Sequence, residues 1–191
     1  MPVLETDIAD IQLRKPVRHV DSQGFFSEVF EEGELVKHGI DIHFVQEDQA
    51  WSASEGVVRG LHFQSAQAKL SGVTAGSICD ITVDIRGSSS FGRHVSAMLS
   101  AIDWDLIFIS EGFAHGYCTP EPDTEVIYEV IYKASACYSH EHDRGLLWSN
   151  PALSIAWPVS ANEALVSDRD RAHPVLSRLP RYFRCELPIN F

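Results

Sequence analysis

Two histidines stand within expected strands, where apolar residues are the usual occupants. The run 57–64 alternates, so that His62 lies on one face of an extended chain and Arg59 on the other. His115 is followed by Gly116, and a glycine lets the backbone approach another group closely. A histidine alone is more often a hydrogen-bonded core residue. The two become candidates for proton transfer only as members of a larger polar set.

The nine histidines raise the question of a metal site. His140-Glu141-His142 has the H-x-H spacing that places two imidazoles on one face of a strand, but it lies in a polar stretch typical of a solvated turn. His62-Phe63-Gln64 offers one imidazole where two would be needed. We therefore expect no bound metal.

Other catalytic signatures are missing from the sequence. It has no G-x-x-x-x-G-K phosphate loop, no G-x-G-x-x-G dinucleotide motif and no G-x-S-x-G nucleophile elbow. The cysteines are far apart and form no C-x-x-C pair, which is typical of reduced thiols in the cytoplasm. They are Cys79, Cys118, Cys137 and Cys185. Covalent catalysis therefore has no strong candidate.

The charge balance limits the partners. Among 191 residues, 27 Asp and Glu outnumber 15 Lys and Arg, for a net charge of -12. Nonspecific binding to nucleic acid or to an anionic membrane is not expected, and an anionic small ligand would need a local basic site. The N-terminal stretch is acidic, and no apolar run approaches the roughly 18 residues of a membrane helix. We expect a cytoplasmic protein without a secretory signal.

Short strands separated by turn residues dominate the chain. Ser77–Ile85 alternates as a half-buried strand, and Glu125–Lys133 carries large side chains on both faces. Further strands are expected at Gly24–Phe30, Val57–Gln64, His94–Leu99, Leu106–Ser110 and Ser154–Trp157, with helical turns only at Glu31–Lys37 and Ile102–Asp105. This pattern predicts an all-β sandwich or small barrel. One domain spans 1–191, with an N-terminal strand region and an extended tail from His173 to Phe191.

Five short sequence motifs follow one another along the chain, namely Arg59-Gly60-Leu61-His62-Phe63-Gln64, Gln67-Ala68-Lys69-Leu70, Val83-Asp84-Ile85-Arg86, Gly112-Phe113-Ala114-His115-Gly116 and Ser167-Asp168-Arg169-Asp170. Their order and spacing resemble those of one enzyme family over roughly residues 15 to 176, the dTDP-4-dehydrorhamnose 3,5-epimerases. The resemblance implies a cupin-type jelly roll, a double-stranded β-helix with a few short helices, that forms a homodimer. It also implies epimerisation of a dTDP-linked 4-keto-6-deoxy sugar without a cofactor.

The resemblance assigns roles to individual residues. His62 is similar to the catalytic base of the family, and Asp170 to the carboxylate that hydrogen-bonds it. Lys69 and His115 resemble groups near the keto oxygen of the sugar, and Tyr138 resembles a tyrosine acid on the opposite face. The positions that line the substrate pocket or hold the nucleotide diphosphate are Phe26, Glu28, Gln46 and Arg59.

The chemistry explains why these residue types are wanted together. In a 4-keto-6-deoxy sugar the hydrogens on C3 and C5 are both alpha to the ketone, so removing either gives an enolate delocalised onto the C4 oxygen. A base on one face and an acid on the other invert the carbon. Each positioned acid or base contributes roughly 10²- to 10⁴-fold, and donors aimed at the oxyanion supply a further large share.

Two departures from the family pattern concern the substrate. Gln23 stands where the family has an arginine, and Asp48 where it has asparagine, and both changes weaken a site for a diphosphate. Epimerisation at C3 or C5 alone is therefore one alternative. A catalytically silent module that binds a sugar nucleotide is another, and a metal-dependent cupin enzyme is a third.

Overall fold

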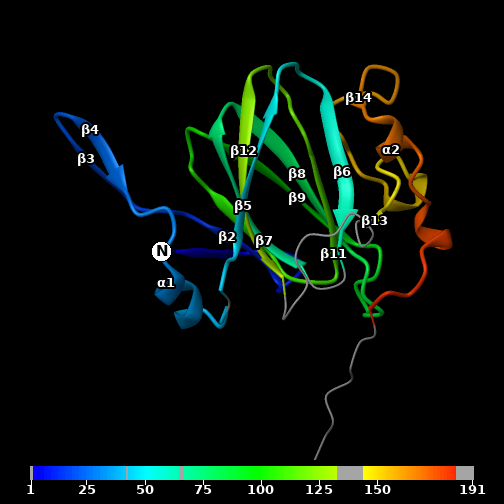
Figure 1. Ribbon diagram of the computed structural model, residues 1–191, viewed down its shortest axis with the longest axis horizontal. Coiled ribbons are helices and arrows are strands. Elements are labelled where there is room, and N and C mark those ends of the chain that lie inside the picture. Colours follow the sequence, from blue (N-terminus) through cyan, green and yellow to red (C-terminus); the bar gives the residue numbers. More distant parts are fainter. Residues whose placement is uncertain (1, 42, 65–66, 133–143, 184–191) are drawn as a thin grey trace, which may run out of the picture.

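Two antiparallel sheets pack face to face in the computed structural model, which describes residues 2–41, 43–64, 67–132 and 144–183 (Figure 1). The first sheet has the strand order β1 (Val3–Glu5), β2 (Ile11–Arg14), β10 (Leu106–Ile109), β7 (Gln67–Ala75), β12 (Thr124–Tyr132) and β5 (Gln46–Ser52). The second has β13 (Arg144–Gly145), β6 (Val57–Phe63), β11 (Phe113–Cys118), β8 (Ser77–Asp84) and β9 (His94–Ser100), with β14 (Leu165–Val166) pairing parallel to β6. This architecture confirms the expected all-β, cupin-like fold.

A hairpin and a few short helices complete the described chain. The hairpin of β3 (Arg18–Asp21) and β4 (Gly24–Ser27) extends away from the two sheets, at the left of Figure 1. The helices are α1 (Glu32–Lys37), α2 (Asp168–Arg171) and the 3-10 turns η1 (Pro151–Leu153) and η2 (Leu176–Arg178). None of the helices in the described ranges has the length and hydropathy to span a membrane.

Two of the expected elements are wrong. The run 154–157 forms no strand, because Ser154 ends η1 in the left-handed conformation (φ 50°) and Pro158 has no N–H to give to a neighbouring strand. The run 102–105 forms a turn and not a helix, since Trp104 also has a positive φ (62°). The helix expected at Glu31–Lys37 is confirmed as α1.

Apolar side chains from both sheets meet in the interior of the sandwich. This core joins the first sheet, through residues such as Ile11, Ile107 and Val126, to β8 and β9 of the second, through Ile78 and Leu99. All five side chains are fully buried. Burial of a side chain of this size contributes about 1.5–3 kcal/mol, so the interdigitation fixes the two sheets against each other. Other buried side chains, such as Asp80 and His115, are polar.

Strand β8 corrects the expectation of a half-buried strand, because both of its faces are buried. Its apolar face, which includes Ile81, is covered by the C-terminal segment through side chains such as Leu176 and Phe183. Its acidic face carries Asp80 and Asp84, both with no exposed surface. Sequence alternation gave the two faces correctly. It could not show that a distant segment covers the apolar face, leaving the acids inside.

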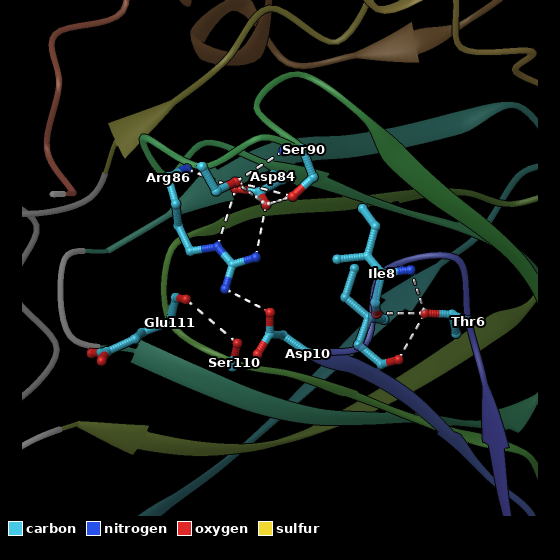
Figure 2. Close-up of polar contacts among 10 residues, drawn as sticks. Thr6, Ile8, Asp10, Asp84, Arg86, Ser90, Ser110 and Glu111 are labelled. Carbon is cyan, nitrogen blue, oxygen red and sulfur yellow. Dashed lines mark hydrogen bonds and ion pairs between the residues drawn. The ribbon is translucent and has the colours of Figure 1, made fainter. Parts of the chain in front are cut away.

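Asp84 is satisfied by a local network of charged and hydroxyl groups (Figure 2). Arg86 Nη2 lies 2.7 Å from Asp84 Oδ2, and Arg86 Nη1 reaches Asp10 at 2.8 Å. Ser90 Oγ also donates to Asp84 Oδ2 at 2.7 Å. Burial raises the pKa of Asp84, but the hydrogen bonds from Arg86 and Ser90 outweigh it and lower the pKa. The network ties the end of β8 to the N-terminal segment.

Candidate active site

A cleft of about 550 Å³ opens between the two sheets. One wall carries β6 and β11 of the second sheet together with α2, and the other carries β5, β7 and β12 of the first. Five predicted site residues line it, namely Arg59, His62, Lys69, His115 and Asp170. The structure thus brings together residues that are more than 100 positions apart in the sequence.

His62 and Asp170 form a hydrogen-bonded pair. His62 Nε2 lies 2.6 Å from Asp170 Oδ1, and the Gly60 backbone N–H donates to Asp170 Oδ2 at 3.3 Å. The His62 side chain is 31% exposed and the Asp170 side chain 5%. Burial raises the pKa of Asp170, but the adjacent His173 imidazole and the hydrogen bond from His62 more than offset this and lower it. Asp170 is therefore a carboxylate that orients His62 and raises its basicity.

Local structure explains how Asp170 reaches His62. Strand β14 pairs with β6 in parallel, with Leu165 opposite Val57, so the chain enters α2 beside β6, the strand that carries His62. Ser167 caps α2 by accepting a hydrogen bond from the Asp170 N–H at 3.1 Å. The word Ser-Asp-Arg-Asp is therefore a helix cap that fixes and buries its last carboxylate, while Asp168 stays exposed.

Two glycines let β6 and β11 approach each other at the cleft. A Cβ on Gly60 would lie 2.6 Å from the Gly116 Cα, and a Cβ on Gly116 would lie 2.5 Å from the Arg59 carbonyl oxygen. Gly60 also has a φ of +134°, which an L side chain rarely adopts. Larger residues at either position would separate the strands that carry His62 and His115.

His115 forms a second pair with an aspartate, deeper in the site. Its Nε2 lies 2.6 Å from Asp80 Oδ2, and Thr82 Oγ1 donates to Asp80 Oδ1 at 3.3 Å. The side chains of His115 and Asp80 are 4% and 0% exposed. His115 is paired with His62 in the register of β11 and β6, so the two imidazoles lie on neighbouring strands of one wall.

Tyr128 is a site residue that the sequence did not single out. It lies on β12 opposite Ser71 of β7, and Ser71 shares a face with Lys69 two positions away. The Lys69 Nζ is 6.0 Å from the centroid of the Tyr128 ring, and the centroids of the Tyr128 and His115 rings are 6.1 Å apart with an interplanar angle of 80°. Burial raises the pKa of Tyr128 well above its ordinary value. The alternation of 125–133 was visible, but the β12–β7 register that turns Tyr128 into the cleft was not.

Arg59 spans the two walls. Its Nη2 donates to the Trp51 carbonyl oxygen at 3.0 Å, and its Nε contacts Ser52 Oγ at 3.4 Å, both on β5. Arg169, from the first turn of α2, also lines the cleft. Together with Lys69 these two arginines make a local basic site on an acidic protein. Sequence analysis missed Arg169, although it stands within the word that supplied Asp170.

The remaining predicted residues are placed differently. Phe26 and Glu28 belong to the hairpin region and do not line the cleft of their own chain; the Phe26 side chain is 65% exposed. Gln46 donates from Nε2 to Asp48 Oδ1 at 2.7 Å, and it is Asp48 that lines the cleft. Tyr138 lies outside the described residues.

His62, Asp170 and His173 are close enough to be tested as a metal site, since their ligating atoms lie within 4.8 Å of one another. Zinc–nitrogen and zinc–oxygen bonds of about 2.0–2.2 Å keep tetrahedral ligand atoms roughly 3.3 Å apart. The 2.6 Å between His62 Nε2 and Asp170 Oδ1 is a hydrogen-bond distance, shorter than that separation. The geometry is that of a histidine–carboxylate pair, and metal-free chemistry stays a prediction.

Comparisons with known proteins give a consistent result. Residues 5–178 match the family model for dTDP-4-dehydrorhamnose 3,5-epimerase. The chain is 42% identical to the Sinorhizobium fredii enzyme of that name, over 96% of this chain and 90% of the relative. It superposes on the Legionella pneumophila epimerase in complex with dTDP-4-keto-L-rhamnose with a TM-score of 0.87, at 32% identity over 94% of both chains. A Streptomyces bikiniensis 3'-monoepimerase in complex with dTDP-quinovose has a TM-score of 0.82, at 29% identity over 91% of this chain and 87% of the relative.

Proposed function

The chain belongs to the dTDP-4-dehydrorhamnose 3,5-epimerase family, and we propose that it inverts C3 and C5 of dTDP-4-dehydro-6-deoxy-D-glucose to give dTDP-4-dehydro-L-rhamnose. The observation that carries the proposal is the His62–Asp170 pair, whose imidazole reaches a cleft bordered by Lys69, His115 and Tyr128. The proposed reaction needs no redox cofactor, because proton removal alpha to a ketone changes no oxidation state.

His62 acts as the base. Its Nε2 is engaged by Asp170, so Nδ1 takes the proton from C3 or C5 of the sugar. The electron pair of the broken C–H bond moves onto the C4 oxygen as an enolate. Asp170 stays ionised and stabilises the imidazolium that forms, in line with its lowered pKa.

The enolate oxygen is stabilised by the deeper part of the site. Asp80 holds His115 in one orientation, which leaves Nδ1 of this buried imidazole for the keto oxygen. Lys69 lies on the opposite wall, beside Tyr128, and brings a positive charge. Preorganised donors of this kind are typically worth 10²- to 10³-fold in rate each.

A tyrosine returns the proton on the opposite face of the ring, and Tyr128 is our candidate for this role. It lies on the wall formed by the first sheet, whereas His62 belongs to the second. Burial keeps its phenol protonated, so it can donate to the enolate carbon. Tyr138 was the predicted acid and stays a prediction, because it lies outside the described residues.

The basic side chains of the cleft would hold the nucleotide diphosphate. Arg59 and Arg169 are its two arginines, and guanidinium groups bind phosphate oxygens in a bidentate way. These arginines supply the local basic site that an anionic ligand needs on a protein with a net charge of -12. The relatives with bound dTDP-sugars support a substrate of the same class.

We further propose that the protein is a homodimer in which the β3–β4 hairpin of one copy completes the cleft of the other. The hairpin extends from the body (Figure 1), and its Phe25 and Phe26 side chains are 49% and 65% exposed. Neither Phe26 nor Glu28 lines the cleft of its own chain. Exposed aromatic side chains on a projecting hairpin favour binding to another chain. A second copy of this protein offers a suitable surface, because Phe26 and Glu28 are missing from its own cleft.

Mixing two inactive variants tests the exchange. His62→Ala removes the base, and Phe26→Ala with Glu28→Gln alters the hairpin. If the hairpin acts on the partner, a mixed dimer contains one cleft with an intact base and an intact hairpin, and mixing restores activity. No recovery after verified subunit exchange would show that each cleft uses its own hairpin.

The primary experiment follows the sugar by NMR in D2O. Incubation of dTDP-4-dehydro-6-deoxy-D-glucose with the protein should give deuterium at both C3 and C5 and the L-rhamno product. A folded His62→Ala protein should give neither. Normal epimerisation by that variant would refute the assignment of the base, and binding without any exchange would identify a silent sugar-nucleotide module.

Epimerisation of a single carbon is the second candidate, and the similarity to a 3'-monoepimerase favours it. Deuterium at one carbon alone would decide in its favour. The third candidate, a metal-dependent cupin enzyme, requires stoichiometric metal in the purified active protein. Elemental analysis together with activity after chelation distinguishes it.

We also propose a cytoplasmic location. Cys79 and Cys118 are buried free thiols, as is usual where the environment is reducing. Burial raises the pKa of Cys79, and that of Cys118 to about 12, so neither is a reactive thiolate. Fractionation of the native host cells would test this location.

A further inference from the structure

A second imidazole contacts the carboxylate that orients the base. His173 Nε2 lies 3.5 Å from Asp170 Oδ1, the same oxygen that accepts the 2.6 Å hydrogen bond from His62. The two histidine rings meet edge to face, with centroids 5.7 Å apart and an interplanar angle of 79°. The side chain of His173 is 12% exposed. One carboxylate oxygen is therefore hydrogen-bonded to one imidazole and lies within ion-pair distance of a second.

The position of His173 is built into the fold. The Leu147 N–H donates to the Pro174 carbonyl oxygen at 2.8 Å, which anchors the chain directly after His173. Gly145 of β13 is paired with His62 of β6, and a Cβ on Gly145 would lie 2.2 Å from the His173 ring. The glycine thus leaves room for the His173 imidazole beside β6.

The buried nitrogen of His173 lies near an acceptor. Nε2 is inaccessible to solvent and has no hydrogen bond within the described ranges. Asp170 Oδ1 is the acceptor to which it lies at ion-pair distance. Leaving a buried polar nitrogen unpaired costs about 1–3 kcal/mol, so a short movement toward Oδ1 is favourable.

We propose that His173 is a positioning residue that shares the Asp170 carboxylate with His62 and thereby keeps His62 in its unprotonated, base-competent form. This inference rests on the proposed function of the cleft. An isolated histidine–carboxylate pair strongly favours the imidazolium, which cannot accept a proton. A second N–H on the same oxygen weakens the hydrogen bond that stabilises the His62 imidazolium. A positive charge on His173 would also repel that imidazolium. In both cases His173 makes His62 easier to deprotonate.

Other titratable groups face His62 and Asp170, and they bear on the same equilibrium. Those that line the cleft are Asp48 on β5, Arg59 on β6, Lys69 on β7, His115 and Tyr117 on β11, Tyr128 on β12 and Arg169 on α2, and Arg144 on β13 is paired with Phe63, next to His62. All of these residues are kept when His173 is replaced. A comparison of His173 variants with the parent protein therefore isolates the effect of the second imidazole.

The test is an NMR titration of the histidine ring protons, which needs no turnover. His173→Phe keeps an aromatic ring beside Gly145 and removes the nitrogen donor. We expect the pKa of His62 to rise by about 0.5–1 unit in this variant, with the His62 resonance identified by its loss in His62→Ala. His94→Phe is the matched control, because His94 lies on β9, two strands beyond β11 in the same sheet. It should leave the His62 titration unchanged.

Kinetics give the second readout. In His173→Phe the acid limb of kcat/KM should move to higher pH, with a roughly 3- to 10-fold loss below the His62 pKa and less than about twofold change on the plateau. An unchanged His62 titration, or an equal loss at every pH, would overturn the proposal. His173→Ala, which has no side-chain nitrogen, replaces the phenylalanine variant if that protein fails to fold. Lack of epimerase activity in the parent protein would refute the proposed function alone, because the titration is independent of it.

Discussion

His62 on β6 is paired directly with His115 on β11, and the Nε2 of each imidazole lies 2.6 Å from its own aspartate oxygen. The two pairs differ in depth, since the His62 side chain is 31% exposed and the His115 side chain 4%. A partly exposed imidazole can gain and lose a proton during turnover. A buried one held by a buried carboxylate is suited to fixed hydrogen bonding. The same chemical pair therefore serves two roles.

Asp170→Asn should lower kcat by roughly 10²- to 10⁴-fold with little change in KM, because the amide no longer supports the imidazolium of His62. The fold should persist, since an isosteric amide still accepts the Gly60 N–H. Steady-state kinetics and circular dichroism measure both effects. A variant with parental kcat would contradict the role of Asp170.

The lowered pKa of Asp170 also predicts a pH dependence of stability. A carboxylate whose pKa is lower in the folded state stabilises the fold above its unfolded pKa of about 3.9, and this contribution is lost as the pH falls through the folded pKa. The difference in unfolding free energy between the parent and Asp170→Asn should therefore be largest near neutral pH and shrink below about pH 4. Urea titrations at several pH values measure it.

Asp80→Asn should affect the oxyanion side of the site and spare the base. The amide allows His115 other tautomers and orientations, so we expect a loss of about 10- to 100-fold in kcat with a nearly constant KM. The acid limb of the pH profile, which reports on His62, should not move. A shifted limb would show that the two histidine pairs are coupled.

The sequence predicted the fold class and five of the residues that line the cleft. Alternation located β6 and β8, and the word Ser-Asp-Arg-Asp supplied Asp170. It could not predict pairings that depend on register, such as Tyr128 opposite Ser71. It also could not show that β14 runs parallel to β6, a contact over 100 residues that turns a surface-type motif into the partner of the base. These features depend on tertiary packing and leave no local pattern.

Arg86→Ala should destabilise the fold by about 3 kcal/mol, because it removes the one cation that pairs with the fully buried Asp84 carboxylate among the described contacts and leaves only hydroxyl donors and the backbone N–H of residue 86 (Figure 2). Adding Asp84→Asn should restore part of the loss, since the unpaired charge is then removed. Arg93→Ala is the control on an exposed arginine and should change the unfolding free energy by less than about 0.5 kcal/mol. Chemical denaturation compares the three proteins.

Asp48→Asn should tighten binding of the dianionic nucleotide sugar. Asp48 brings a negative charge to the cleft that holds Arg59 and Arg169. Its removal should lower KM by about two- to fivefold at low ionic strength, with a smaller effect at high salt because exposed charges are screened. Glu47→Gln, the neighbouring residue on β5, removes the same charge from the opposite face of the strand and should have little effect.

Tyr128→Phe and Tyr138→Phe together decide which tyrosine is the acid. Loss of the acid leaves proton removal by His62 intact but prevents delivery from the other face, so exchange of the substrate hydrogens should continue while inversion slows by about 10²-fold or more. We expect this signature from Tyr128→Phe, because Tyr128 lines the cleft beside Lys69 and His115. Deuterium exchange and product stereochemistry, measured in one NMR experiment, separate the two steps. The same signature from Tyr138→Phe, with normal inversion by Tyr128→Phe, would assign the acid to Tyr138.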